Sequence, residues 1–277
     1  MRRIFLFCPL KPALILVLFL AVLSGGYTTA LRAGTKVSSS SITKEELRAL
    51  QRRATGRSVC ERCRRPTRTC ICDCLPAEPI DTITHVLVLQ HPREFRRRKS
   101  VSTVPLLSMV LRNFKVKVGS SFDSGDLPMI QDAISTKGQT PLLLFPGDGA
   151  LSLDSRKPSI IPSNNQTKQT LVLVDGTWTQ SAGIILIRKS PWLRQQCQLV
   201  QFTETAASNY GTIRREPRAN CLSTLEACTR ALTCMEAHNP NVTQASHYLH
   251  QSLAKLISTQ LQYSQSTTNC QSTDTFS

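Results

Sequence analysis

The chain of 277 residues is long enough for one or two domains, and with 40% hydrophobic residues it can bury a sizeable core. Its 12 glycines and 15 prolines are too few for a chain that is disordered throughout. The 34 basic and 18 acidic residues give a formal net charge of +16. Residues 1–44 hold six of the basic residues and no acid, so the remainder has 28 basic against 18 acidic residues, a balance of +10. This charge favours a polyanionic partner, with nucleic acid as the first candidate and simple solubility charge as the alternative.

Residues 1–44 have the composition of a cleavable targeting leader. Arg2 and Arg3 precede an apolar run over 13–23, which is shorter than the about 20 residues of a membrane span. After Gly26 the chain is rich in Ser and Thr, basic and free of acids. A signal-like piece before a transit-like piece is typical of bipartite leaders of complex plastids. We therefore expect an organelle, a plastid rather than a mitochondrion, and no stable membrane insertion of the mature chain. The alternatives are a plain organelle presequence, the secretory route, an amphipathic anchor, and the cytosol or nucleus.

Residues 45–80 form a small cysteine-rich module. It contains two close pairs of cysteines, Cys60 with Cys63 and Cys70 with Cys72. Two thiolate pairs joined by a short basic linker suit a tetrahedral, structural zinc site, because each pair can hold one side of the ion. Cys74 is a spare that we leave out of the tetrahedron. Neighbouring arginines would keep the thiolates ionised and could also touch phosphates. A disulfide knot is the alternative if the chain is secreted.

Strands and helices alternate over residues 81–265. Strands are predicted over 83–90, 114–119, 141–146, 171–175 and 196–203. Helices are predicted over 103–112, 127–135, 179–187, 223–237 and 243–263. Residues 152–169 are polar and are expected to form a loop, and residues 266–277 a disordered tail. The alternation predicts an α/β domain with a mostly parallel sheet and helices on both faces.

The predicted strand over 171–175 ends in an acid. Its continuous apolar run is typical of a strand buried on both faces. Asp175 stands where the strand stops, and in open α/β sheets the chemistry gathers at the carboxyl ends of the strands. The alternative is a strand–turn–helix corner with a capping acid. The sequence has no P-loop and no G-x-G-x-x-G after a strand, and Leu173 occupies the place of a phosphatase nucleophile.

Several motifs occur together in a fixed order. They are the cysteine cluster with Arg-Pro at 65–66, His-Pro-x-Glu at 91–94, Leu-Phe-Pro-Gly at 144–147, Asp-Gly-Thr-Trp at 175–178, Arg-Arg-Glu-Pro at 214–217 and Ser-Thr-Leu-Glu-Ala at 223–227. Over about residues 57–237 this set resembles the DTW-domain family, the tRNA-uridine aminocarboxypropyltransferases. The one departure is Ser181-Ala-Gly-Ile184, where the family usually has an alanine and basic residues.

The resemblance implies a SPOUT-like, knotted α/β core that uses S-adenosylmethionine. It implies transfer of the 3-amino-3-carboxypropyl group to N3 of a tRNA uridine, with release of methylthioadenosine. Asp175 would be the catalytic residue, as a general base or as an orienter of the substrate. Two alternatives stay open: a zinc-dependent RNA-binding protein without catalysis, and a related S-adenosylmethionine-dependent enzyme that acts on rRNA or transfers a methyl group.

The resemblance also implies roles for other residues. The cofactor is expected to contact Leu144, Phe145, Pro146, Gly147, Thr177, Trp178, Ser223, Thr224 and Glu226. The substrate or its RNA backbone is expected to contact His91, Glu94, Arg97, Arg98, Arg214 and Arg215. The basic run 96–99 would attract RNA phosphates, and the target would be an unstacked uridine. Structural alternatives are a helix cap at 223–226, a core position for Trp178, a strand-end hydrogen bond for His91, and solvated charges at 96–99 and 214–215. Nothing in the sequence indicates the oligomeric state.

Overall fold

A computed structural model of the chain describes residues 58–97, 101–135, 139–154, 168–175, 182–204, 206–213 and 221–271. Contacts divide the chain into two units, Met1–Gln51 and Arg52–Ser277, and all of the described residues lie in the second. The predicted leader lies outside the described residues, as do residues 45–57 of the cysteine-rich module and residues 272–277 of the predicted tail.

Six strands form one sheet in the order β2-β1-β5-β3-β6-β4, and each pair of neighbours is parallel. The strands are β1 (His85–Gln90), β2 (Phe114–Val118), β3 (Leu142–Leu144), β4 (Leu151–Ser152), β5 (Thr170–Asp175) and β6 (Gln198–Gln201). The predicted parallel sheet is therefore confirmed. In the register of the sheet, Gln90 lies beside Asp175 and Leu144 beside Leu173. Because the strands run the same way, their carboxyl ends lie at one edge of the sheet.

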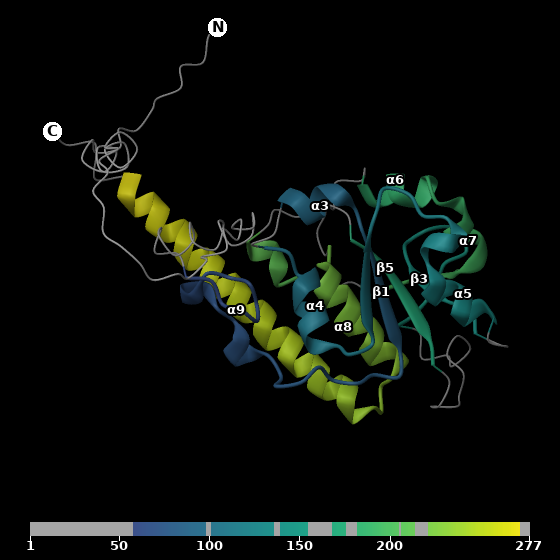
Figure 1. The fold of residues 1–277 in the computed structure, drawn as a ribbon, viewed down its shortest axis with the longest axis horizontal. Helices are drawn as coiled ribbons and strands as arrows, with labels where there is room; N and C mark the ends of the chain where they lie inside the picture. Colours follow the sequence, from purple (N-terminus) through teal and green to yellow (C-terminus); the bar gives the residue numbers. More distant parts are fainter. Residues whose placement is uncertain are drawn as a thin grey trace, which may run out of the picture. The chain divides into compact units, whose positions relative to one another are not determined.

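Helices cover both faces of this sheet, as predicted (Figure 1). They are α3 (Pro92–Arg97), α4 (Val104–Val110), α5 (Pro128–Ser135), α6 (Ala182–Arg188), α7 (Pro191–Gln196), α8 (Thr224–Met235) and α9 (Pro240–Gln271). Helices α4, α8 and α9 share one buried cluster, and α5, α6 and α7 share the other. Alternate residues of a strand serve the two faces: Val88 packs in the first cluster and Leu89 in the second. A strand covered on both sides has to be apolar throughout, which explains the unbroken runs in β1 and β5.

The cysteine-rich segment packs against the first of these clusters. Its two short 3-10 helices are η2 (Thr67–Thr69) and η3 (Cys72–Cys74). Ile71 and Leu75 are buried among residues of that cluster. Asp73 also forms an ion pair of 3.3 Å with Lys255 of α9. The cysteine segment and the long helix α9 are thus joined through a shared core.

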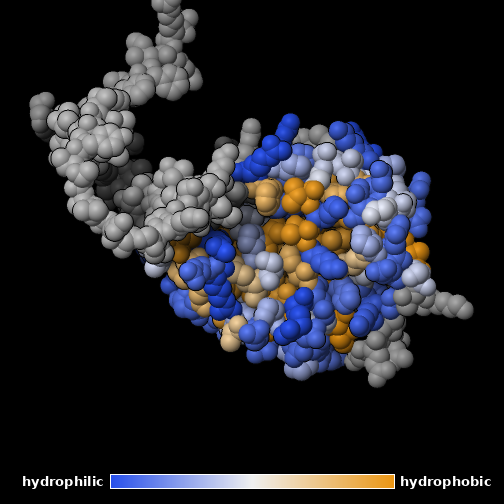
Figure 2. Space-filling model, in the orientation of Figure 1, coloured by the Kyte–Doolittle hydropathy of each residue, from blue (hydrophilic) through white to orange (hydrophobic). Residues whose placement is uncertain are grey.

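Strand β2 is an edge of the sheet and is mostly exposed. Val116 and Val118 are exposed there and alternate with Lys115 and Lys117. Charged side chains on an edge strand oppose pairing with a second sheet. Figure 2 shows that hydrophilic residues cover most of the described surface on one face of the molecule, with an apolar area near its middle.

The structure contains elements that hydrophobic periodicity did not predict, namely α3, α7 and β4. Helices α3 and α7 each have six residues and begin with a proline, a residue that favours the first helical position. Helix α9 begins at Pro240 rather than at Thr243 and includes residues 266–271 of the expected tail. No glycine or proline follows Pro240 to end this helix.

Among the described residues, none of the helices combines the length and hydropathy of a membrane span. The predicted knot stays a prediction, since several of the segments that connect the described elements lie outside the described residues.

Candidate active site

Asp175 lies at the carboxyl end of β5, with hydrogen bonds to both of its carboxylate oxygens. The side-chain amide of Gln90 donates to Oδ2 at 2.7 Å, and the hydroxyl of Thr224 donates to Oδ1 at 2.5 Å. The backbone carbonyl of Asp175 accepts a hydrogen bond of 3.0 Å from the N–H of His91. Residues of β1, β5 and α8 therefore meet at this carboxylate. Each carboxylate oxygen can accept a further hydrogen bond, so Asp175 keeps acceptor capacity for a substrate N–H.

Helix α8 begins with the capping box that the sequence predicted. The hydroxyl of Ser223 accepts from the N–H of Glu226 at 3.2 Å, and the Glu226 carboxylate accepts from the N–H of Ser223 at 2.7 Å. The same carboxylate accepts from the Ser208 hydroxyl and the Asn209 N–H, each at 2.8 Å. The helix-cap alternative is confirmed for Ser223 and Glu226. Their contact with the cofactor stays a prediction, and it is Thr224 whose side chain reaches Asp175.

The loop after β3 contains the predicted cofactor residues 144–147. Leu144 and Phe145 are half-buried, whereas Pro146 and Gly147 are exposed. A Cβ atom added at Gly147 would meet only a methyl carbon of Leu199, at 3.8 Å, which is ordinary contact. The described protein therefore does not itself require glycine at this position. An exposed backbone without a side chain, at the carboxyl edge of a parallel sheet, suits the close approach of a ligand.

The other predicted site residues lie around α3 or outside the described residues. His91 directly precedes α3, and its Nδ1 accepts a hydrogen bond of 3.2 Å from the N–H of Arg93. Burial lowers the pKa of the His91 imidazole, and the charge of Arg93 lowers it further. Glu94 lies in the first turn of α3 and Arg97 at its end. The predicted residues outside the described part of the chain are Arg98, Thr177, Trp178, Arg214 and Arg215.

Sequence reasoning missed Gln90, which is 4% exposed and holds the carboxylate of Asp175. A polar residue at the end of an otherwise apolar strand is a signal that could have found it. The role of that residue depends on the register that sets Gln90 beside Asp175, and register is a property of the assembled sheet.

The four predicted cysteine ligands come together. The Sγ atoms of Cys60, Cys63, Cys70 and Cys72 all lie within 4.8 Å of one another. The Cys60–Cys72 distance is 3.5 Å and the Cys63–Cys70 distance is 3.7 Å. A tetrahedral zinc ion with Zn–S bonds of about 2.3 Å places its sulfurs about 3.8 Å apart, so this set fits zinc. All four are free thiols rather than disulfides, and Cys74 lies outside the set.

The thiols of this cluster differ in acidity. Hydrogen bonds from the backbone of Cys63, from the thiols of Cys70 and Cys72 and from the backbone of Arg62 together lower the pKa of the Cys60 thiol to about 6. Burial, together with the neighbouring thiols, raises the pKa of the Cys72 thiol to about 12. A divalent cation held between the sulfurs would ionise all four.

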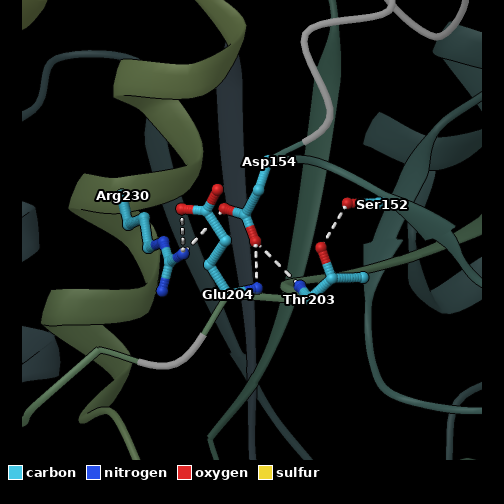
Figure 3. A network of polar contacts seen from close by, with 5 residues as sticks. All are labelled: Ser152, Asp154, Thr203, Glu204 and Arg230. Atoms are coloured by element: carbon cyan, nitrogen blue, oxygen red, sulfur yellow. Dashed lines mark hydrogen bonds and ion pairs between the residues drawn. The ribbon is translucent and has the colours of Figure 1, made fainter.

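A second polar network attaches α8 to the strands β4 and β6 (Figure 3). Asp154 pairs with Arg230 of α8 at 2.8 Å and accepts from the N–H groups of Thr203 at 2.7 Å and Glu204 at 2.9 Å. The guanidinium of Arg230 also lies over the ring of Phe202, 4.5 Å from its centroid. These contacts fix the helix whose first turn carries Thr224.

Comparison with known proteins gives a family match. The family model described as DTW domain matches residues 57–261. The protein named tRNA-uridine aminocarboxypropyltransferase 2 from Macaca fascicularis is 36% identical over 188 residues, which cover 67% of this chain and 59% of that protein. Its namesake from Drosophila melanogaster is 35% identical over 187 residues, covering 65% of this chain and 68% of that protein. No solved structure matches the chain.

A plant relative aligns over more of the chain. The protein named tRNA-uridine aminocarboxypropyltransferase A from Arabidopsis thaliana is 26% identical over 231 residues, covering 75% of this chain and 82% of that protein. The chain spans only 59% of the length of the macaque and mouse relatives that it matches.

Proposed function

Because the chain belongs to the DTW-domain family, we propose that it is a tRNA-uridine aminocarboxypropyltransferase. It transfers the 3-amino-3-carboxypropyl group of S-adenosylmethionine to N3 of a tRNA uridine. The observation that carries the proposal is the Asp175 carboxylate, held by Gln90 and Thr224 at the carboxyl edge of the sheet within the matched region. The names of the relatives, at 26% to 36% identity, support the same activity.

The reaction sets two tasks for the residues of the chain. S-adenosylmethionine, when bound, supplies an electrophilic methylene carbon beside its sulfonium, and methylthioadenosine is the product that leaves. The protein has to hold the uracil so that N3 faces this carbon, and the N3 proton has to pass to a side chain or to water. Holding the reacting groups in line also decides whether the aminocarboxypropyl or the methyl carbon is attacked.

Asp175 performs the task at N3. Its carboxylate has capacity for one more hydrogen bond on each oxygen, and the uridine N3–H is a donor that suits it. Gln90 and Thr224 hold the carboxylate in one orientation, so the acceptor is in place before the substrate arrives. Asp175 then either receives the N3 proton as a general base or orients the uracil while water receives it.

The loop after β3 would hold the cofactor. Its exposed backbone at Pro146 and Gly147 would hold polar groups of S-adenosylmethionine, and the half-buried Leu144 and Phe145 would provide apolar contact. Thr224 belongs to the same site because its hydroxyl donates a hydrogen bond to Asp175. Thr177 and Trp178 lie outside the described residues, and we propose that they contact the same cofactor because they follow Asp175 closely in the sequence.

The cysteine cluster holds one structural zinc ion, bound by Cys60, Cys63, Cys70 and Cys72. The soft, tetrahedral sulfur set supports zinc over hard cations such as magnesium.

The acid-free residues 1–44 direct the chain to an organelle, which we propose to be a plastid rather than a mitochondrion.

The test is a product assay on the zinc-loaded protein. It is incubated with S-adenosylmethionine and unmodified tRNA, the RNA is digested to nucleosides, and the uridines are weighed by mass spectrometry. We expect uridine that carries an aminocarboxypropyl group, and we expect it to be absent with the Asp175→Asn variant. A methylated uridine would overturn the group transferred, and modified rRNA with unmodified tRNA would overturn the substrate. Tight RNA binding without any modified nucleoside would favour an RNA-binding protein without catalysis.

A further inference from the structure

The arginines of the cysteine segment divide into two pairs that the sequence does not distinguish. The guanidinium of Arg62 donates to the backbone carbonyls of Pro76 and Ala77, so it serves the fold of the segment. Arg65 is half-buried, and its backbone carbonyl accepts a hydrogen bond of 2.8 Å from the N–H of Cys60. These two arginines therefore have contacts within the protein.

Arg64 and Arg68 are directed outward. Both are exposed, and the guanidinium of neither has a hydrogen-bond or ion-pair partner among the described residues. The stretch from Ser58 to Cys70 holds these four arginines against a single acid, Glu61. The outward surface of the segment is thus positively charged, and its charge is not neutralised by a described neighbour.

The backbone of Arg64 is in a conformation that does not favour arginine. Its φ is +57°, and it is the one residue other than glycine with a positive φ in the described part of the chain. Its N–H closes the turn by donating to the carbonyl of Cys60 at 2.9 Å. Glycine adopts this left-handed conformation most easily, whereas a side chain there is strained. An arginine that is strained at its backbone and lacks a described partner suggests that its side chain serves a ligand.

The cysteine segment and the first turn of α8 share one buried cluster. Cys63 and Tyr210 both pack in it, and the N–H of Tyr210 donates to the Glu226 carboxylate at 3.4 Å. Glu226 caps the helix that begins with Thr224, the residue that holds Asp175. We therefore expect one polyanion to contact both the exposed side of the cysteine segment and the carboxyl edge of the sheet.

We infer that Arg64 and Arg68 bind backbone phosphates of the tRNA substrate, so that the cysteine segment is a docking surface for tRNA as well as a metal site. A guanidinium group suits this role because it can donate two parallel hydrogen bonds to one phosphate. The inference rests on the proposed function, since it takes tRNA to be the substrate.

The test measures the affinity of the full, zinc-loaded chain for unmodified tRNA at several salt concentrations. Arg64→Gly removes the charge and gives the turn the residue that its backbone favours, and Arg64→Lys keeps the charge. Arg68→Gln tests the second contact. Arg194→Gln, on the exposed side of α7, is the control for loss of one charge elsewhere.

We expect Arg64→Gly and Arg68→Gln each to weaken tRNA binding by roughly five- to tenfold and to lower the slope of log affinity against log salt by about 1. Arg194→Gln should stay within roughly twofold of the wild type. Arg64→Lys should keep the salt slope but lose part of the affinity, because lysine keeps the charge and not the paired hydrogen bonds. Zinc content and affinity for S-adenosylmethionine should be unchanged in all four variants.

The inference is overturned if both Arg64→Gly and Arg68→Gln bind tRNA with the wild-type affinity and salt slope. It is also overturned if the weaker binding occurs only together with loss of zinc, because the side chains would then serve the cysteine site. Failure of the proposed function is a separate result, in which the wild-type chain itself neither binds nor modifies tRNA.

Discussion

The hydroxyl of Thr224, the first residue of α8, donates a hydrogen bond of 2.5 Å to Oδ1 of Asp175, the last residue of β5. This bond joins the start of a helix to the end of a buried strand, and both ends are fixed separately. The capping box of Ser223 and Glu226 fixes the helix, and the pairing of β5 with β1 and β3 fixes the strand. The acid at the centre of the proposed mechanism is therefore oriented by a residue from another part of the fold.

Replacing Thr224 by valine is expected to slow the transfer reaction. The change keeps the shape of the side chain but removes the donor to Oδ1. A hydrogen bond to a charged group contributes about 1.5–3 kcal/mol, so the turnover rate with tRNA should fall by roughly 10- to 100-fold. Thr224→Ser keeps the hydroxyl and should retain most of the rate. A Thr224→Val enzyme that turns over at the wild-type rate would show that the reaction does not need the hydrogen bond from Thr224 to Asp175.

Replacing Gly147 by alanine is expected to weaken cofactor binding without weakening the fold. The new Cβ would meet only Leu199 within the described protein, at 3.8 Å. Any steric clash would therefore be with the bound cofactor. The affinity for S-adenosylmethionine, measured by calorimetry, should fall roughly tenfold, the loss of about one backbone hydrogen bond. Gly125→Ala is the matched control, because a Cβ at Gly125 has open space. Equal cofactor affinity in the two variants would contradict the placement of the cofactor on this loop.

The network around Asp154 predicts a clear difference between two acids that both approach Arg230. The side chain of Asp154 is 5% exposed and pairs at 2.8 Å, whereas that of Glu204 is 77% exposed and lies at 3.8 Å. Asp154→Ala leaves a cation and two backbone N–H groups without their acceptor, and should lower the free energy of unfolding by about 2–4 kcal/mol. Glu204→Ala should change it by less than about 0.5 kcal/mol. Urea unfolding of the two variants checks this, and similar effects would count against it.

The cysteine cluster predicts which thiols the metal needs. Cys72→Ser should lose the single zinc ion per chain and lower the Tm, because metal binding and folding of the segment are coupled. Cys74→Ser should retain the zinc, since Cys74 lies outside the set of four. Metal analysis of the purified proteins measures both. Zinc retained by Cys72→Ser, or lost from Cys74→Ser, would show that the ligand set is different.

Local patterns were sufficient to predict much of the fold. The apolar runs of β1 and β5 indicated strands covered on both faces, and the Ser223–Glu226 spacing located the start of α8. Helices α3 and α7 were missed because six residues give too little periodicity, although each begins with proline. The order of the strands depends on contacts between distant segments and is not encoded in any local pattern.

In the candidate site, too, some features follow from local sequence and others depend on contacts between distant segments. The four cysteines could be found from their spacing, and the position of Asp175 from the end of an apolar run. The bond from Gln90 to Asp175 could not, because it depends on the register of two strands whose partners are far apart in the chain. The different contacts of Arg62 and Arg64 could not be predicted either. Both occur in one short basic stretch, and only the folded turn distinguishes them.

The most direct test of the central claim follows which atoms of the donor reach tRNA. S-adenosylmethionine is supplied with one label in its carboxyl carbon or, in a parallel reaction, with one label in its methyl carbon. The account predicts that unmodified tRNA acquires the carboxyl label and not the methyl label, and that Asp175→Asn abolishes the incorporation. Incorporation of the methyl label alone would show a methyltransferase and would contradict the account.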